Sequence, residues 1–139
     1  MRKGTPISKI MTTKVITLDR KDTLEYAEQI FKTNRIRHIP VVDGDKLLGM
    51  LSYTDLLRIS FADSINEDEG IIDAVVYNLF TIDQVMIKKV VCVSSTTTIK
   101  EVGELLVTRQ FHAVPIVDNE KLVGIITTTD LINYLLDQF

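Results

Sequence analysis

The chain has 139 residues, of which 45% are hydrophobic and 25% are charged, and its formal net charge is −3. This composition is typical of a globular protein that forms one compact domain or two small packed halves. The negative charge excludes a general electrostatic attraction to nucleic acid or anionic membrane, and no apolar run approaches the roughly 18 residues of a membrane span.

The N-terminal residues form no signal-peptide pattern, and a single cysteine excludes an internal disulfide. We therefore expect a reduced, cytoplasmic protein.

An internal duplication organises the chain. A shift of 75 residues superposes 7–57 on 82–132 without a gap, and 15 of these 51 paired positions are identical. We therefore predict a first repeat domain at 1–59, a linker at 60–81 and a second repeat domain at 82–139.

Each repeat begins with a short lead-in and continues with a β-branched run that predicts a strand. The lead-ins are 7–11 and 82–86, and the runs are 15–18 and 90–93. Cys92 lies in the second run, where we expect an inert, buried thiol.

A helix with one apolar stripe follows in each repeat, because apolar residues recur there at helical spacing. The stripe residues are Leu24, Ala27, Ile30 and Phe31 in the first repeat and Ile99, Val102, Leu105 and Leu106 in the second. Capping-box spacing places the helix starts at Asp22, with Glu25, and at Thr98, with Glu101. Gly103 weakens the second of these helices by up to about 1 kcal/mol.

Two strands then form a hairpin in each repeat, because Asp-Gly or Asp-Asn between apolar runs indicates a tight turn. The predicted strands are 39–42 and 47–51 in the first repeat and 114–117 and 122–126 in the second. Closing helices follow at 55–60 and 130–137. Each repeat is thus β-α-β-β-α, and the predicted fold class is mixed α/β. A three-stranded unit cannot cover its own sheet, so we expect the copies to pack sheet to sheet with pseudo-two-fold symmetry.

The segment between the repeats has two parts. Residues 63–70 are acidic and predict a solvated turn, whereas the apolar spacing over 71–80 predicts a linker helix.

A hydroxyl-rich turn joins the last strand of each repeat to its closing helix. Ser52-x-x-Asp55 and Thr127-x-x-Asp130 have capping-box spacing, which requires no ligand. Both copies add a second hydroxyl, Thr54 or Thr129, directly before the aspartate. Both also place a glycine, Gly49 or Gly124, on the preceding strand, where the lack of a Cβ lets another group approach closely. The exposed N–H groups of a helix start suit an anion, so these turns are also candidate nucleotide sites.

Cationic residues precede the hairpin at equivalent places. Arg37 and His38 do so in the first repeat and His112 in the second, and they are candidates to hold phosphate. Arg35 and Arg109 fit better as surface residues at helix C-termini. No nucleophile–base pair, Walker loop or metal-ligand cluster is present, so we expect neither an enzyme nor a metal site.

Together these motifs resemble tandem cystathionine β-synthase (CBS) domains, the pair called a Bateman module, as a stand-alone CBS-domain protein. The resemblance covers about 7–57 and 82–132. It rests on Met11 and Met86, on His38-Ile-Pro-Val-Val-Asp43 and Val114-Pro-Ile-Val-Asp118, and on the two Gly-to-Asp endings.

The resemblance implies regulatory binding of AMP, ADP, ATP, S-adenosylmethionine or a dinucleotide, in clefts between the repeats. Asp55 and Asp130 would take ribose hydroxyls, and Ser52, Thr54, Thr127 and Thr129 would contact ribose or phosphate. Ile16, Ile36, Val91 and Phe111 would hold adenine, and Arg37, His38 and His112 would face phosphates. In related pairs one cleft combines both repeats, so we expect Asp130 with Ile16 and Ile36, and Asp55 with Val91 and Phe111.

Two functions follow. The first is a nucleotide sensor that changes the geometry of its own homodimer or of a partner protein. The second is a ligand-independent oligomerisation or interaction scaffold, in which the capping boxes are structural only.

Overall fold

The computed structural model describes residues 4–63 and 79–139, which form two compact units. One unit is the continuous stretch Ile16–Val90, and the other combines Met1–Val15 with Val91–Phe139. The elements confirm the predicted mixed α/β class, and each unit carries the hairpin of one repeat with the two longer helices of that repeat. None of the described helices is long and apolar enough to cross a bilayer.

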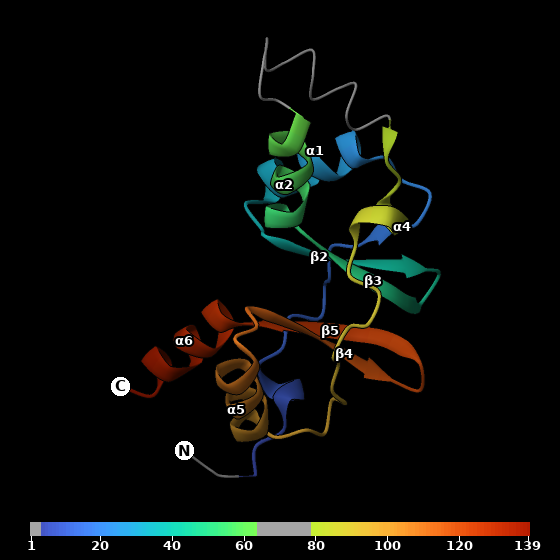
Figure 1. Ribbon diagram of the computed structural model, residues 1–139. Coiled ribbons are helices and arrows are strands. Elements are labelled where there is room, and N and C mark those ends of the chain that lie inside the picture. The colour runs from blue at the N-terminus through green and yellow to red at the C-terminus, as the bar shows by residue number, and fades with distance from the viewer. Residues whose placement is uncertain (1–3, 64–78) are drawn as a thin grey trace. The chain divides into compact units, whose positions relative to one another are not determined.

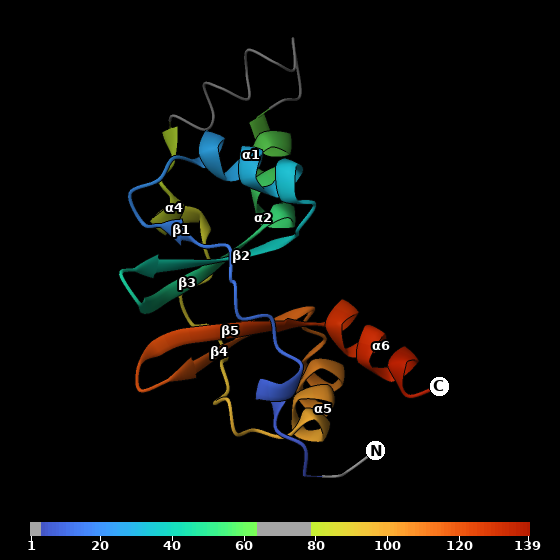
Figure 2. The same cartoon turned by 180° about the vertical axis from the view of Figure 1, so that it is seen from behind.

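The first unit is built on a small mixed sheet. Its elements are β1 (Leu18–Asp19), α1 (Leu24–Asn34), β2 (His38–Asp43), β3 (Lys46–Ser52), α2 (Tyr53–Asp63) and α4 (Ile82–Val85). Strand β1 runs parallel to β2, and β2 runs antiparallel to β3. Helices α1 and α2 lie on the same side of the β2–β3 hairpin (Figures 1 and 2). Their apolar faces enclose a core that includes Phe31, Ile39, Leu51 and Leu56, each at most 1% exposed.

The second unit repeats this plan with fewer strands. Its elements are the 3-10 turn η1 (Ile7–Lys9), α5 (Ile99–Arg109), β4 (Ala113–Asp118), β5 (Lys121–Thr127) and α6 (Thr128–Asp137). Strands β4 and β5 are antiparallel, and α5 packs below their hairpin in Figure 1. The core joins Ile7, Val102, Leu106, Val114, Ile116 and Ile126.

The lead-in of each repeat packs on the hairpin of the other repeat. Residue Thr12 exchanges backbone hydrogen bonds of 2.9 and 3.0 Å with Ile125 of β5. Residue Ile87 does the same with Met50 of β3, at 2.9 and 3.0 Å. The compact units therefore differ from the sequence repeats by an exchange of lead-ins.

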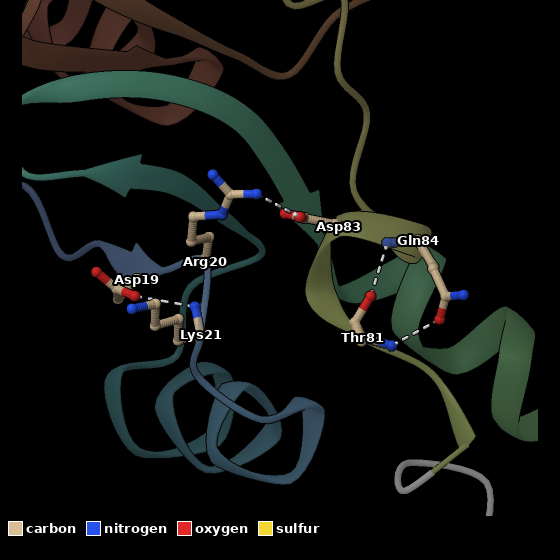
Figure 3. Close-up of polar contacts among 6 residues, drawn as sticks. All are labelled: Asp19, Arg20, Lys21, Thr81, Asp83 and Gln84. Atoms are coloured by element: carbon tan, nitrogen blue, oxygen red, sulfur yellow. Dashed lines mark hydrogen bonds and ion pairs between the residues drawn. The ribbon is translucent and has the colours of Figure 1, made fainter.

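Polar contacts also anchor the second lead-in. Thr81 and Gln84 form a complete capping box at the start of α4, and Arg20 reaches Asp83 at 3.2 Å (Figure 3). In the turn before α1, the Lys21 N–H donates to Asp19 Oδ1 at 2.9 Å. These bonds hold the start of α4 in place. They also order the turn that carries Arg20, the residue that binds α4.

The hairpins and the apolar stripes agree with the sequence predictions. Each strand of the hairpins extends one residue beyond the predicted bounds at both ends, and the closing helices begin two residues early, at Tyr53 and Thr128. Helix α2 runs to Asp63, so the first residues of the predicted linker are helical. Residues 64–78, which hold most of the predicted acidic turn and linker helix, lie outside the described residues.

The prediction of a first strand over 15–18 and over 90–93 is wrong for most of these residues. Only Leu18 and Asp19 pair with β2, and in 90–93 only Val93 forms a bridge, with Ile116. A β-branched run favours an extended backbone, but a strand also needs a neighbour along its length. Cys92 is exposed rather than buried, because successive side chains alternate and it is Val93 that packs on the core.

The first helix cap also differs from the prediction. Thr23, not Asp22, is the N-cap of α1 and accepts the Tyr26 N–H at 3.0 Å. Asp22 instead accepts the Asp19 N–H at 2.8 Å and closes the preceding turn. Thr98 is the N-cap of α5, as predicted.

Candidate ligand-binding junctions

The junction of β3 with α2 holds a half-made helix cap. Ser52 Oγ accepts the Asp55 N–H at 3.0 Å, as a capping box requires. The Asp55 carboxylate does not return the bond to Ser52. Its Oδ1 lies 3.2 Å from Arg58 Nη1, and its Oδ2 is buried with no hydrogen-bond partner among the described residues. The prediction of a complete capping box is therefore wrong here.

The junction of β5 with α6 is a complete capping box, as predicted. Thr127 Oγ1 accepts the Asp130 N–H at 3.1 Å, and the Thr127 N–H donates to Asp130 Oδ2 at 2.9 Å. Asp130 thus uses one carboxylate oxygen to close the helix, whereas Asp55 leaves the equivalent oxygen open.

The structure brings each cationic turn beside the junction of its own repeat. His38 is paired with Ser52 across the β2–β3 ladder, and the Tyr53 N–H donates to the Arg37 carbonyl at 2.9 Å. The Thr128 N–H donates likewise to the His112 carbonyl at 3.0 Å. Arg37 and His112 are exposed and His38 is half-buried. The backbone of each turn is therefore bonded to the first residue of a closing helix.

The other predicted ligand residues fall into two groups. Thr54 and Thr129 are exposed on the first turn of their helices and are not part of the hydrophobic cores. Of the adenine candidates, Ile36 and Phe111 are half-buried against the cores of their own units, Val91 is half-buried and Ile16 is 36% exposed. The predicted combinations of Asp130 with Ile16 and of Asp55 with Val91 join different compact units and stay predictions.

The two helix-end arginines match their structural interpretation. Arg35 is the C-cap of α1 with a left-handed φ of 54°, and Arg109 is the last residue of α5. Both are exposed. Their positions at the C-termini of α1 and α5 are those expected of surface residues that end a helix.

Gly49 and Gly124 admit a close neighbour, but that neighbour is the chain itself. A Cβ on Gly49 would lie 2.6 Å from Met86 Sδ, and one on Gly124 would lie 2.7 Å from Met11 Sδ. The glycines therefore accept the exchanged lead-ins, which explains why Met11 and Met86 recur with them.

Arg58 is the residue of this junction that the sequence interpretation missed. It lies three residues after Asp55 on the same helix, a spacing at which opposite charges interact. That spacing is visible in the sequence. Among the described residues, no group of three or more His, Cys, Asp or Glu side chains is placed to hold a metal ion.

Known proteins of similar structure include ligand complexes. The structure of CBSX2 in complex with AMP has a TM-score of 0.81 at 20% identity, covering 97% of this chain and 98% of that one. The CBS domain pair of protein MJ0100 from a complex with 5′-methylthioadenosine and S-adenosyl-L-methionine has a TM-score of 0.77 at 23% identity, covering 97% and 98%. At these identities the likeness shows the fold.

Other similar proteins have higher sequence identity to this chain. The structure described as the acetoin utilization protein AcuB of Vibrio cholerae is 28% identical with a TM-score of 0.82, covering 96% of this chain and 91% of that one. Protein MJ1225 of Methanocaldococcus jannaschii is 30% identical over 131 residues, 94% of this chain. The chain spans 42% of MJ1225, and 21% of an inosine-5′-monophosphate dehydrogenase of the same organism that is 33% identical to it.

The CBS domain family model matches the chain twice, at 7–62 and 82–137. These ranges contain both hairpins, both junctions and both lead-ins. The chain belongs to the CBS domain family and carries a pair of its repeats.

Proposed function

We propose that the chain binds an adenosine-containing ligand at its two strand-to-helix junctions. The observation that carries this proposal is the buried Asp55 Oδ2, which has no partner among the described residues. A buried acceptor without a donor is costly, so a ligand hydroxyl placed there gains more than it would at a satisfied group. A ribose diol is a donor of this kind. The complexes of CBSX2 with AMP and of MJ0100 with S-adenosyl-L-methionine support the same ligand class.

Each junction offers the parts that a nucleotide needs. Asp55 and Asp130 accept ribose hydroxyls, while the hydroxyls of Ser52, Thr54, Thr127 and Thr129 contact ribose or phosphate. Arg37, His38 and His112 face phosphate, which the partial positive charge of a helix start also favours. Ile16, Ile36, Val91 and Phe111 hold adenine. The ligand is AMP, ADP, ATP, S-adenosylmethionine or a dinucleotide.

The bound ligand regulates the chain and is not itself chemically changed. A ligand that ties a helix start to neighbouring elements shifts the equilibrium between conformations of the chain. The regulated object is a homodimer of this chain or a partner protein in the cytoplasm.

Calorimetric titration tests the binding proposal. AMP, ATP and S-adenosylmethionine are titrated into the wild-type chain and into the double variant Asp55→Ala/Asp130→Ala. We expect heat of binding for at least one ligand in the wild-type chain and its loss in the double variant. Circular dichroism checks that the double variant remains folded. Tight binding that survives in a folded double variant contradicts the site assignment.

A second candidate function is an interaction scaffold without a ligand. It is favoured by α6, whose described residues Ile132, Leu135 and Leu136 are 52%, 44% and 62% exposed. Large apolar side chains gathered on one exposed helix mark a contact surface. A ligand at 100 times its dissociation constant adds about 2.7 kcal/mol to the free energy of unfolding. Thermal denaturation that no adenosine compound shifts favours the scaffold.

A further inference from the structure

The two junctions differ at the residue three positions after the aspartate. This residue is Arg58 in α2 and Asn133 in α6. Arg58 Nη1 lies 3.2 Å from Asp55 Oδ1, and the side chain of Arg58 is 75% exposed while that of Asp55 is 16% exposed. The arginine therefore reaches inward from water to a carboxylate that is mostly covered.

The two carboxylates are held in different ways as a result. Asp130 turns Oδ2 back to the Thr127 N–H at 2.9 Å, because a neutral Asn133 offers no charge that draws it away. Asp55 turns Oδ1 to Arg58 and keeps Oδ2 buried without a partner. The same motif thus has a closed form in α6 and an open form in α2.

We infer that Arg58 is a positioning residue that holds the Asp55 carboxylate off the helix cap and makes the first junction the tighter of the two for a vicinal diol. This inference rests on the proposed function. A diol at Asp55 donates to an oxygen that the empty protein leaves unsatisfied. At Asp130 one oxygen already accepts the Thr127 N–H, and the other, Oδ1, is not among the buried oxygens that lack a partner in the described residues, so a diol there satisfies no orphaned acceptor. The free energy gained from the hydrogen bond is therefore larger at Asp55.

The role of Arg58 is directional rather than stabilising. An ion pair with an arginine this exposed contributes little to folding, since water screens the charge. What the pair determines is which backbone group the carboxylate faces. A variant without it remains folded, so its effect on the cap is measurable.

Amide hydrogen exchange tests the positioning role without any ligand. In the wild-type chain we expect the Thr127 amide to exchange more slowly than the Ser52 amide, since only Thr127 donates to its aspartate. In Arg58→Asn the Asp55 carboxylate returns to the cap, and we expect the Ser52 amide to slow roughly tenfold. Arg58→Lys keeps a cation and retains the wild-type rate. An unchanged Ser52 rate in Arg58→Asn overturns the inference.

Titration with AMP tests the ranking of the junctions. We expect two dissociation constants in the wild-type chain and a rise of the lower one by roughly tenfold in Arg58→Asn. Asn133→Arg lowers the higher constant, and 2′-deoxy-AMP loses the difference between the sites. Lys100→Asn removes a comparable exposed pair, with Glu104 on α5, and changes neither constant.

The outcomes separate this inference from the proposed function. AMP binding that Asp55→Ala removes but Arg58→Asn leaves unchanged overturns the role of Arg58 and keeps the site. A wild-type chain that binds none of AMP, ATP and S-adenosylmethionine overturns the proposed function and, with it, the ranking of the sites. The exchange measurement still decides the position of the carboxylate.

Discussion

Met86 packs directly against the bare Cα of Gly49. A Cβ on Gly49 would lie 2.6 Å from Met86 Sδ and 2.7 Å from the Ile87 carbonyl oxygen. The methionine side chain can move, but the Ile87 backbone is held by two hydrogen bonds to Met50. We expect Gly49→Ala to lower the free energy of unfolding by about 1–3 kcal/mol, measured by urea denaturation. An unchanged denaturation midpoint contradicts the close packing of this lead-in.

Gly103 provides the opposite case of the same substitution. It lies inside α5, and apart from the backbone of α5 itself and the adjoining residues a Cβ there would meet no atom of the described residues within 4 Å. Glycine loses more backbone entropy in a helix than alanine does, so we expect Gly103→Ala to raise the free energy of unfolding by about 0.5–1 kcal/mol. The same urea experiment measures both glycines. A destabilised Gly103→Ala shows that this position is tighter than the structure has it.

The two aspartates of the junctions should differ in stability when no ligand is present. Asp130→Ala removes the bond that Asp130 Oδ2 accepts from the Thr127 N–H, which is one half of the capping box and costs about 1 kcal/mol. Asp55→Ala removes no bond to the Ser52 N–H and relieves a buried oxygen without a partner, so we expect a smaller loss. Urea denaturation of the two single variants gives the comparison. Equal losses contradict the half-made cap at Asp55.

Asp118 should make stability depend on pH. The hydroxyl of Ser95, followed by its backbone N–H, donates to the carboxylate and lowers the pKa of Asp118 below its ordinary value of 3.8. A lowered pKa in the folded state means that the charged form stabilises the fold above 3.8 and that this stabilisation is lost as pH falls through the folded pKa. We expect Asp118→Asn to be less stable than the wild-type chain near neutral pH.

The difference in the free energy of unfolding between the wild-type chain and Asp118→Asn should disappear in acid. Urea denaturation at about pH 7, about pH 5 and about pH 2 measures the difference, in which the titration of all other groups cancels. A gap that stays constant down to about pH 2 contradicts a role for the charge of Asp118.

The parts of the fold that the sequence predicts are those set by local pattern. The hairpins follow from the apolar runs on either side of the turns that begin at Asp43 and Asp118, and the stripe beginning at Leu24 follows from helical spacing. Because the two repeats align without a gap, both predictions apply at equivalent positions of each repeat. Such patterns report which side of an element is buried, and burial decides these elements.

The features that the sequence did not predict depend on a choice between partners. Asp55 has two partners at the same spacing, the Ser52 N–H and Arg58, and the spacing alone does not rank them. The run 90–93 has strand propensity, but only Val93 finds a neighbour. The glycine at position 49 indicated a close approach, and only the structure identifies Met86 as the group that approaches.

The exchange of lead-ins also sets an order of folding during synthesis. The unit Ile16–Val90 is one continuous stretch, so it is complete as soon as residue 90 has left the ribosome. The other unit joins a segment made before Ile16–Val90 to a segment made after it, through the Thr12–Ile125 bonds. Contacts so distant in sequence close slowly, and the first lead-in stays unpaired until β5 emerges. Removal of 1–15 or of 91–139 therefore damages the same unit and leaves its neighbour whole.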